Sequence, residues 1–365
     1  MTLLQRTLAS VAPLAIAACL AAGPAAAAEK LNVVASFSIL GDMASRVGGD
    51  RVAVTTLVGP DGDAHVFQPA PADAKRLADA DLIVINGLGF EGWLPRLIEA
   101  AGIDVPIAVA TSGITQIPNE EDDHGGAEPE GHDHDHAAEG EAAHAGHDHD
   151  DAEPAGHDHD DAEPAGHDHD HDHAAEGEAA AEEHGHDHGA FDPHGWQNLA
   201  NGAIYADNIA EGLCAIDNDD CDGFKANAAA YRAEIEALDA DIRARVAAVP
   251  EARRIVITSH DAFGYFADAY GIKVIAPQGV STDAEASAAD VANLIRQIRE
   301  TGAKALFVEN IADPRLIEQI ASETGVVIGG RLYSDALSPP DGPAPTYLAM
   351  IRHNAELMFT AMAAE

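Results

Sequence analysis

One segment of this 365-residue chain, from Asn119 to Ala190, cannot contribute to a folded core. It has no Lys or Arg, 26 Asp or Glu, and 16 of the 20 histidines. Gly146 to Ala155 reads GHDHDDAEPA, Gly156 to Ala165 repeats this decamer unchanged, and Gly166 begins a third copy. A segment with few large apolar residues and one sign of charge is typical of disorder. The sequence therefore predicts a disordered His/Asp-rich insertion, and the fold must be built from the residues that flank it.

The same segment has the composition of a metal-binding tract. Neutral imidazole is a common ligand for zinc, copper and nickel, and carboxylates add negative charge beside it. A solvated acidic linker would not require the strict alternation of His and Asp, so we interpret the tract as a set of weak, auxiliary metal sites. Their candidate ligands are His132, His134, His136, His147, His149, His157, His159, His167, His169, His171, His173, His184, His186 and His188.

The start of the chain, from Met1 to Ala28, reads as a secretory signal peptide. It combines a lone Arg6, an apolar run and the small residues Ala26-Ala27-Ala28 at the expected cleavage site. Ile16-Ala17-Ala18-Cys19 resembles a lipoprotein cleavage box, and anchoring at Cys19 is the alternative that we favour less. No later stretch reaches the roughly eighteen apolar residues of a membrane span. We therefore expect an exported, periplasmic protein.

The charge of the remaining chain favours cations as partners. The formal net charge is −43, and the tract's −26 leaves −17 for the rest. Such a surface repels nucleic acid and anionic membranes, so we expect no nucleic-acid partner. Without signal peptide and tract, the chain is still long enough for two modest domains or one large one. In an oxidising compartment the close pair Cys214 and Cys221 favours a disulfide over a metal site.

The apolar pattern of the chain outside the signal peptide and tract predicts two α/β lobes. Runs of Val and Ile without alternation, separated by helical patterns, are typical of parallel strands covered on both faces. We expect strands at 31–36, 52–58, 82–85 and 107–109 before the insertion, and at 255–258, 272–275, 305–308 and 326–328 after it. Residues 224–249 form the longest helical pattern, which would span about 39 Å and join the halves as a rigid strut.

This pattern divides the chain into six parts. They are the signal peptide (1–28), an N-terminal lobe (29–118), the insertion (119–190), a segment that completes the N-terminal lobe (191–222), a linker helix (223–250) and a C-terminal lobe (251–365). Because a long loop adds little closure entropy, the fold tolerates the insertion.

Four residues outside the tract lie where parallel sheets bind ligands. His65 and His260 each follow an expected strand, Asp335 follows the last strand by a short connection, and His194 lies on a loop between a proline and a glycine. Ligand crevices of open α/β sheets form at the carboxyl ends of the strands. A single histidine is more often a surface or capping residue, but the placement of these four together predicts a site in the inter-lobe cleft. Three imidazoles and one carboxylate suit four-coordinate zinc.

The chain also resembles the zinc- and manganese-binding solute-binding proteins of bacterial ABC importers, the ZnuA/TroA type of the cluster A-I family. The motifs are GPDGDAH at 59–65, DPHGW at 192–196, TSHDAFGYF at 258–266, and LYSDALS at 332–338 with downstream GPA and TY. They occur in family order over nearly the whole mature chain. The resemblance implies two lobes joined by a long helix, with His65, His194, His260 and Asp335 as metal ligands. Manganese members are similar but place a carboxylate at the third position, so His260 favours zinc.

The function implied by the resemblance is that of a receptor, not an enzyme. It would capture Zn2+ outside the cytoplasmic membrane and deliver it to the permease of a zinc ABC transporter for zinc uptake. We expect a monomer, and loading by a periplasmic zinc chaperone stays open. One alternative is a metal buffer or adhesin that works through the tract. Another is a zinc hydrolase, which would need a fourth position open to water. Against it, the sequence contains no HExxH or GxSxG motif, and Asp335 would close that position.

Residues near these motifs leave some roles open. Trp196, beside His194, either shields the metal from water or is ordinary core. Glu309 and Asp283 are candidates for contacts behind the ligands. His353 is expected to be a surface histidine without a role.

Overall fold

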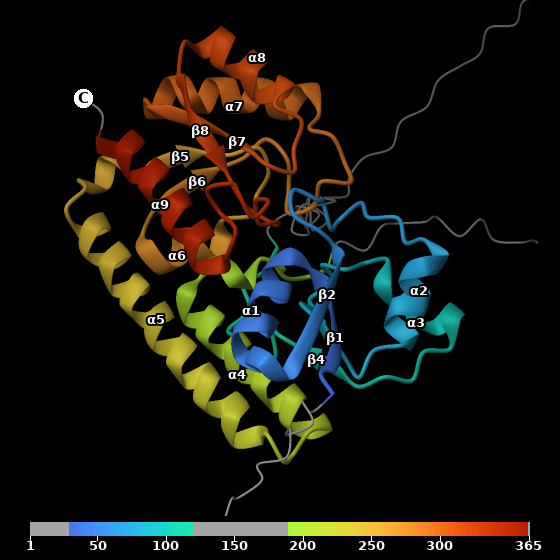
Figure 1. Ribbon diagram of the computed structural model, residues 1–365. Helices are drawn as coiled ribbons and strands as arrows, with labels where there is room; N and C mark the ends of the chain where they lie inside the picture. The colour runs from blue at the N-terminus through green and yellow to red at the C-terminus, as the bar shows by residue number, and fades with distance from the viewer. Residues whose placement is uncertain (1–28, 120–188, 364–365) are drawn as a thin grey trace, which may run out of the picture. The chain divides into compact units, whose positions relative to one another are not determined.

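The computed structural model describes residues 29–119 and 189–363. The expected signal peptide with Cys19, the disorder expected of the tract and all fourteen auxiliary histidines lie outside the described residues, so these stay predictions. The described residues form two lobes, each built on a parallel sheet (Figure 1). The predicted α/β class with two parallel-sheet lobes is confirmed.

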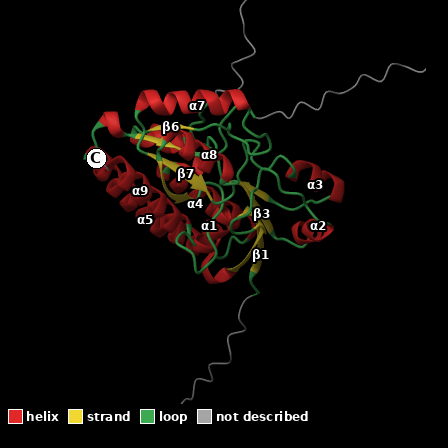
Figure 2. Cartoon of the chain, turned by 90° about the horizontal axis from the view of Figure 1, so that it is seen from above, coloured by secondary structure: helices red, strands yellow, loops and turns green. Residues whose placement is uncertain are grey.

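The first lobe has the strand order β2-β1-β3-β4. Its strands are β1 (Leu31–Phe37), β2 (Val52–Val58), β3 (Leu82–Ile85) and β4 (Ile107–Val109), and its first helices are α1 (Ser38–Gly48), α2 (Pro71–Ala78) and α3 (Leu94–Ala101). The sequence analysis did not predict α3, because eight residues with a proline in the first turn give too short a helical period. Figure 2 shows α2 and α3 together on the outer side of this sheet.

Both faces of this sheet are covered. Val33 and Ala35 of β1 belong to a core that includes residues of α1. Val34 belongs to a second core with Leu77 of α2 and Leu94 of α3. Neighbouring residues of one strand point to opposite faces, so a strand buried on both sides needs apolar residues at consecutive positions. This explains the unbroken Val and Ile runs.

The second lobe repeats this plan with the order β6-β5-β7-β8. Its strands are β5 (Ile255–Ile257), β6 (Lys273–Ile275), β7 (Ala305–Glu309) and β8 (Val327–Leu332), and its helices are α6 (Gly264–Tyr270), α7 (Ala288–Thr301), α8 (Arg315–Thr324) and α9 (Tyr347–Ala363). β8 continues past its predicted end at Ile328, through Gly329 and Gly330 and a shift in register against β7. A side chain at Gly329 would meet the Phe307 ring at 2.7 Å, so glycine here marks close packing and not a strand end.

Two long helices follow one another between the two sheets, and the second of them contacts both lobes. α4 (Leu199–Ile216) is followed by α5 (Cys221–Ala247), and the predicted disulfide between Cys214 and Cys221 joins them. α5 has 27 residues, a length of about 40 Å. Its buried residues recur every three or four positions: Phe224, Ala228, Tyr231, Ile235, Leu238, Ile242 and Val246. This face contacts α1 and α4 of the first lobe and α6 and α9 of the second, as Figure 1 shows.

One hydrophobic core is shared by the two lobes. It includes Val33 from the first sheet, Val256 and Phe307 from the second, and residues of α5 and α9. The outer faces of the two sheets have separate cores of their own. Separating the lobes would therefore expose apolar surface that the shared core now buries. Among the described helices, none is long and apolar enough to cross a membrane.

The insertion begins and ends at neighbouring points of the first lobe. The backbone N–H of Asn119 donates to the carbonyl of Ala190 (3.0 Å), and that of Asp192 donates to the carbonyl of Ile117 (2.9 Å). The chain thus leaves the lobe and returns to it at one place, and it continues directly toward His194.

Candidate metal centre

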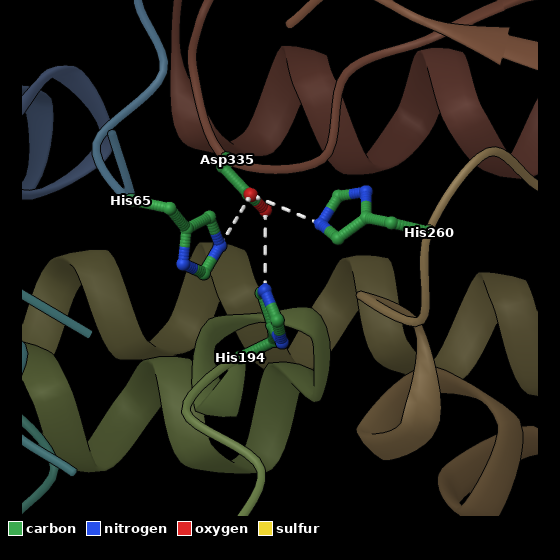
Figure 3. Close-up of side chains that lie close together, drawn as sticks. All are labelled: His65, His194, His260 and Asp335. Atoms are coloured by element: carbon green, nitrogen blue, oxygen red, sulfur yellow. Dashed lines mark hydrogen bonds and ion pairs between the residues drawn. The ribbon is translucent and has the colours of Figure 1, made fainter. Parts of the chain in front are cut away.

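The four residues predicted to bind metal converge in the structure (Figure 3). One nitrogen or oxygen atom from each of His65, His194, His260 and Asp335 lies within 4.8 Å of the others. The Nε2 atoms of His65 and His260 lie 3.2 and 3.1 Å from Asp335 Oδ2, and the Nε2 atom of His194 lies 3.6 Å from Asp335 Oδ1. Two of the four come from each lobe, so the group bridges the lobes.

Local structure fixes each histidine. His65 lies within the loop between β2 and α2, and His260 lies on the loop that directly follows β5. His194 immediately precedes the short 3-10 helix η3 (Gly195–Gln197). A side chain at Gly195 would lie 2.6 Å from the Tyr205 hydroxyl, so only glycine allows the turn to approach α4 this closely.

The site is closed to solvent except at one of the four candidate ligands. The side chain of His65 is 5% exposed, whereas those of His194, His260 and Asp335 are fully buried. Trp196 is also fully buried; its ring lies 5.3 Å from the His194 ring, and its Nε1–H donates to the carbonyl of Ser334. Trp196 is therefore a core residue that also covers one side of the site.

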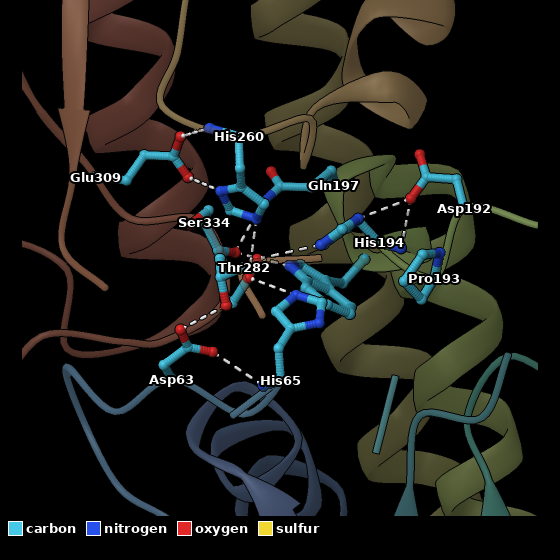
Figure 4. A network of polar contacts seen from close by, with 12 residues as sticks. Asp63, His65, Asp192, Pro193, His194, Gln197, His260, Thr282, Glu309 and Ser334 are labelled. Carbon is cyan, nitrogen blue, oxygen red and sulfur yellow. Dashed lines mark hydrogen bonds and ion pairs between the residues drawn. The ribbon is translucent and has the colours of Figure 1, made fainter. Parts of the chain in front are cut away.

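A carboxylate lies behind each of the two buried histidines (Figure 4). Asp192 Oδ1 accepts from the backbone N–H of His194 (2.9 Å) and lies 2.7 Å from its Nδ1. Glu309 Oε1 accepts from the backbone N–H groups of Ser259 (2.7 Å) and His260 (3.0 Å). Its Oε2 lies 2.7 Å from His260 Nδ1, at ion-pair distance but without hydrogen-bond alignment. A proton held on Nδ1 leaves Nε2 free to bind a metal.

The structure also places the residues near the motifs whose roles the sequence left open. Glu309 contacts the candidate ligand His260, whereas Asp283 is exposed and its backbone N–H donates to the Ser281 hydroxyl. The sequence analysis gave no role to Asp192, although a carboxylate two residues before His194 was a usable signal. His353 lies away from the site, with Nε2 3.0 Å from the carbonyl of Arg331.

The charges of the site depend on one another. Burial disfavours a charged His194, but the Asp335 and Asp192 carboxylates outweigh it and raise the pKa of His194 to about 9. Burial likewise opposes a charged His260, and Glu309 with Asp335 raises its pKa well above the usual value. Burial also opposes a charged Asp335, yet His260 and His194 hold its pKa well below the usual range. The cavity thus stabilises positive charge around Asp335.

The donor set fits a divalent cation. His194 Nε2 and Asp335 Oδ1 are buried and form no hydrogen bond with any described residue. A cation between them would interact with both. Three imidazole nitrogens and one carboxylate oxygen, each offering one atom, match the donors of a closed four-coordinate site.

Comparison with known proteins places the chain among metal receptors. Residues 33–361 match the family described as "Zinc-uptake complex component A periplasmic", ZnuA. The chain belongs to this family. It is 29% identical over 328 residues to the iron-binding protein YfeA of Yersinia pestis, covering 90% of this chain and 85% of that protein.

Two solved structures resemble the fold closely. The periplasmic zinc-binding protein TroA of Treponema pallidum has a TM-score of 0.69 and 25% identity, covering 92% of this chain and all of TroA. The Mn-bound periplasmic metal-binding protein of Candidatus Liberibacter asiaticus has a TM-score of 0.68 and 27% identity, covering 91% and 100%.

Membership in the ZnuA family fixes the general function. This protein is a metal-binding substrate receptor of an ABC transporter and works with a membrane permease. The family consists of solute receptors, so the prediction that the chain is not an enzyme is confirmed. The names of the relatives refer to iron, manganese and zinc. The family therefore gives metal binding without choosing the metal.

Proposed function

We propose that this protein binds Zn2+ through His65, His194, His260 and Asp335 and delivers it to the permease of a zinc ABC transporter. The observation that carries the choice of zinc is the donor set, three imidazoles and a single carboxylate gathered within 4.8 Å. Nitrogen-rich four-coordinate sites suit zinc, whereas manganese prefers oxygen donors. Glu309, the nearest further carboxylate to His260, faces Nδ1 and not the shared cavity.

The residues of the site have different roles in metal binding. Asp192 and Glu309 orient His194 and His260 so that both Nε2 atoms face Asp335. Zn2+ displaces the protons that these imidazoles hold in the metal-free state, because the metal and the proton compete for the same nitrogen. The folded lobes hold the four residues close together, so little conformational entropy is lost on binding.

We extend the proposal to the signal peptide and the His/Asp-rich tract, which the structure does not describe. The signal peptide would place the receptor in the periplasm, where it would act as a monomer, with or without a zinc chaperone that loads it. The His/Asp-rich tract would bind several zinc ions weakly and raise the local zinc concentration. Ordering its backbone costs about 1–2 kcal/mol per residue, which makes its sites weaker than the preformed cleft.

A competition titration tests this proposal. Mature protein and a variant without residues 124–188 are titrated with zinc and manganese against a chelator of known affinity. We expect one tight zinc site in both, with manganese bound far more weakly. His260→Ala should remove the tight site, whereas His353→Ala, a histidine outside the cleft, should leave it unchanged. Equal affinities for zinc and manganese would contradict the choice of metal.

The tract deletion also separates the receptor from a metal buffer or adhesin. If the tract were the working part, its removal would abolish tight binding, and the assignment of the three cleft histidines would have to be reopened. A transport assay completes the test. A strain that lacks this protein should recover growth in zinc-depleted medium when the parent is supplied, and should fail to recover with His260→Ala.

A further inference from the structure

His65 differs from the other three proposed ligands in its exposure to solvent. The other three ligand side chains are fully buried, and only His65 has exposed surface. The neighbouring residue Val66 is 47% exposed. The His65 ring lies against the Phe90 ring, with 4.8 Å between the ring centroids. The side of the site that faces solvent is therefore the side of His65, on the loop between β2 and α2.

The Asp63 carboxylate connects His65 to the opposite lobe. Asp63 Oδ1 accepts from the backbone N–H of His65 (2.9 Å), which holds the histidine in place. Asp63 Oδ2 accepts from the hydroxyl of Thr282 (2.6 Å), on the connection between β6 and α7 in the second lobe. Figure 4 shows Asp63 between these two partners. The position of His65 thus depends directly on a side chain from the other lobe.

The same loop has a second attachment that is farther from His65. The backbone N–H of Asp61 donates to the carbonyl of Leu337 (2.9 Å), and its carboxylate accepts from Asn310 Nδ2 (3.0 Å). Loss of the Thr282 contact would therefore free Asp63 from the second lobe, while the loop stays attached at Asp61 and at Ala64, whose carbonyl accepts from Trp93 Nε1 (2.8 Å). The metal ligands themselves would be unchanged.

We propose that Thr282 is a positioning residue whose hydrogen bond to Asp63 acts as a latch and sets the rate at which metal passes His65. The inference rests on the proposed function, because it takes His65 as a ligand. While the latch is closed, His65 completes the site; while it is open, His65 swings away and the ion exchanges with solvent. Opening of the latch allows both entry and release of the ion. Loss of the latch therefore changes the association and dissociation rates more than it changes the equilibrium affinity. The β6–α7 connection is then the place where a docked permease can trigger release.

The test compares three threonine variants of the full mature chain. Thr282→Val keeps the shape of the side chain and removes the hydroxyl, and Thr282→Ser restores the hydroxyl without the methyl. Thr301→Val is the matched control, because Thr301 lies at the end of α7 and donates only to the carbonyl of Gln297 within its own helix. Each protein is loaded with one equivalent of zinc, and release into excess chromogenic chelator is followed by stopped flow.

The expected result is an increase in the release rate of about tenfold for Thr282→Val, the lower range for a hydrogen bond to a charged group. Thr282→Ser and Thr301→Val should release zinc at the parental rate. Parental release by Thr282→Val would overturn the latch, and so would fast release by Thr282→Ser, because packing would then be the cause. Failure of the proposed function looks different: parent and variants alike would hold no tight zinc. X-ray absorption of zinc-loaded Thr282→Val should give the parental ligand set, and a lost nitrogen ligand would overturn a purely kinetic role.

Discussion

Replacing Glu309 with Gln should weaken zinc binding far more than replacing Asp192 with Asn, although both carboxylates lie behind a histidine ligand. Glu309 uses both of its oxygens. Oε1 accepts from the backbone N–H groups of Ser259 and His260, and Oε2 lies 2.7 Å from His260 Nδ1. Among the described residues, Asp192 makes its contacts to His194 through Oδ1 alone, which faces both the backbone N–H and Nδ1 of His194.

This difference determines which contacts survive when an amide side chain replaces each carboxylate. An Asn side chain can keep its oxygen at the Oδ1 position and preserve both contacts to His194. A Gln side chain cannot preserve all contacts of Glu309, because its NH2 group must face either the two backbone N–H groups or the protonated Nδ1. A donor facing a donor costs at least the lost hydrogen bond, about 1.5–3 kcal/mol for a charged acceptor. That corresponds to zinc binding roughly 10- to 100-fold weaker, the usual range for partners of metal-binding histidines. The Asp192 change alters charge alone and should cost about fivefold, the gap between a charged and a neutral acceptor.

Chelator competition at pH 7.5 gives both dissociation constants, and thermal unfolding without metal checks that both variants fold. The imidazole 15N shifts of the metal-free protein provide an independent measurement. In Glu309→Gln the pKa of His260 should fall, because a neutral amide replaces the carboxylate whose charge raises it in the parent. An Asp192→Asn variant that loses as much affinity as Glu309→Gln, or more, would refute the reasoning from oxygen usage.

Three further predictions concern the site and the lobes. His65→Ala, His194→Ala and His260→Ala should each weaken zinc binding by orders of magnitude, and Asp335→Ala by less, because water can fill one position; chelator competition measures all four. Since the folded-state pKa of His194 is about 9 against the ordinary 6.5, its charge stabilises the metal-free fold below pH 6.5, and this contribution is lost as pH rises toward 9. Zinc competes with that proton, so its apparent affinity should rise over the same window in titrations at pH 6.5, 8 and 9. Because the lobes share a core and the continuous helix α5, X-ray scattering should show no large compaction on zinc addition, and a marked change in radius of gyration would contradict this.

Much of this protein was predictable because the relevant information is local in the sequence. The unbroken Val and Ile runs indicated parallel strands, since each residue type reflects the environment of its own position. The four candidate ligands were predictable for a related reason. Strand ends of a parallel sheet share one edge, so residues that follow different strands can be expected to meet without knowledge of the packing. The continuation of β8 through its two glycines was not predictable, because the close packing at Gly329 comes from the Phe307 ring of another strand.

The sequence by itself determined the class of fold, the two lobes and the chemical character of the site. The tertiary structure alone decided which side chains hold that site in place. Asp63 and Thr282 are 219 residues apart in the chain, and neither has a local pattern that marks the other as a partner. Glu309 and the backbone of His260 likewise have no local pattern that marks them as partners. The core that the two lobes share is also formed by residues far apart in the chain. A hydrogen bond depends on distances of a few tenths of an ångström, and only the packing of complete lobes sets distances between residues so far apart in the chain.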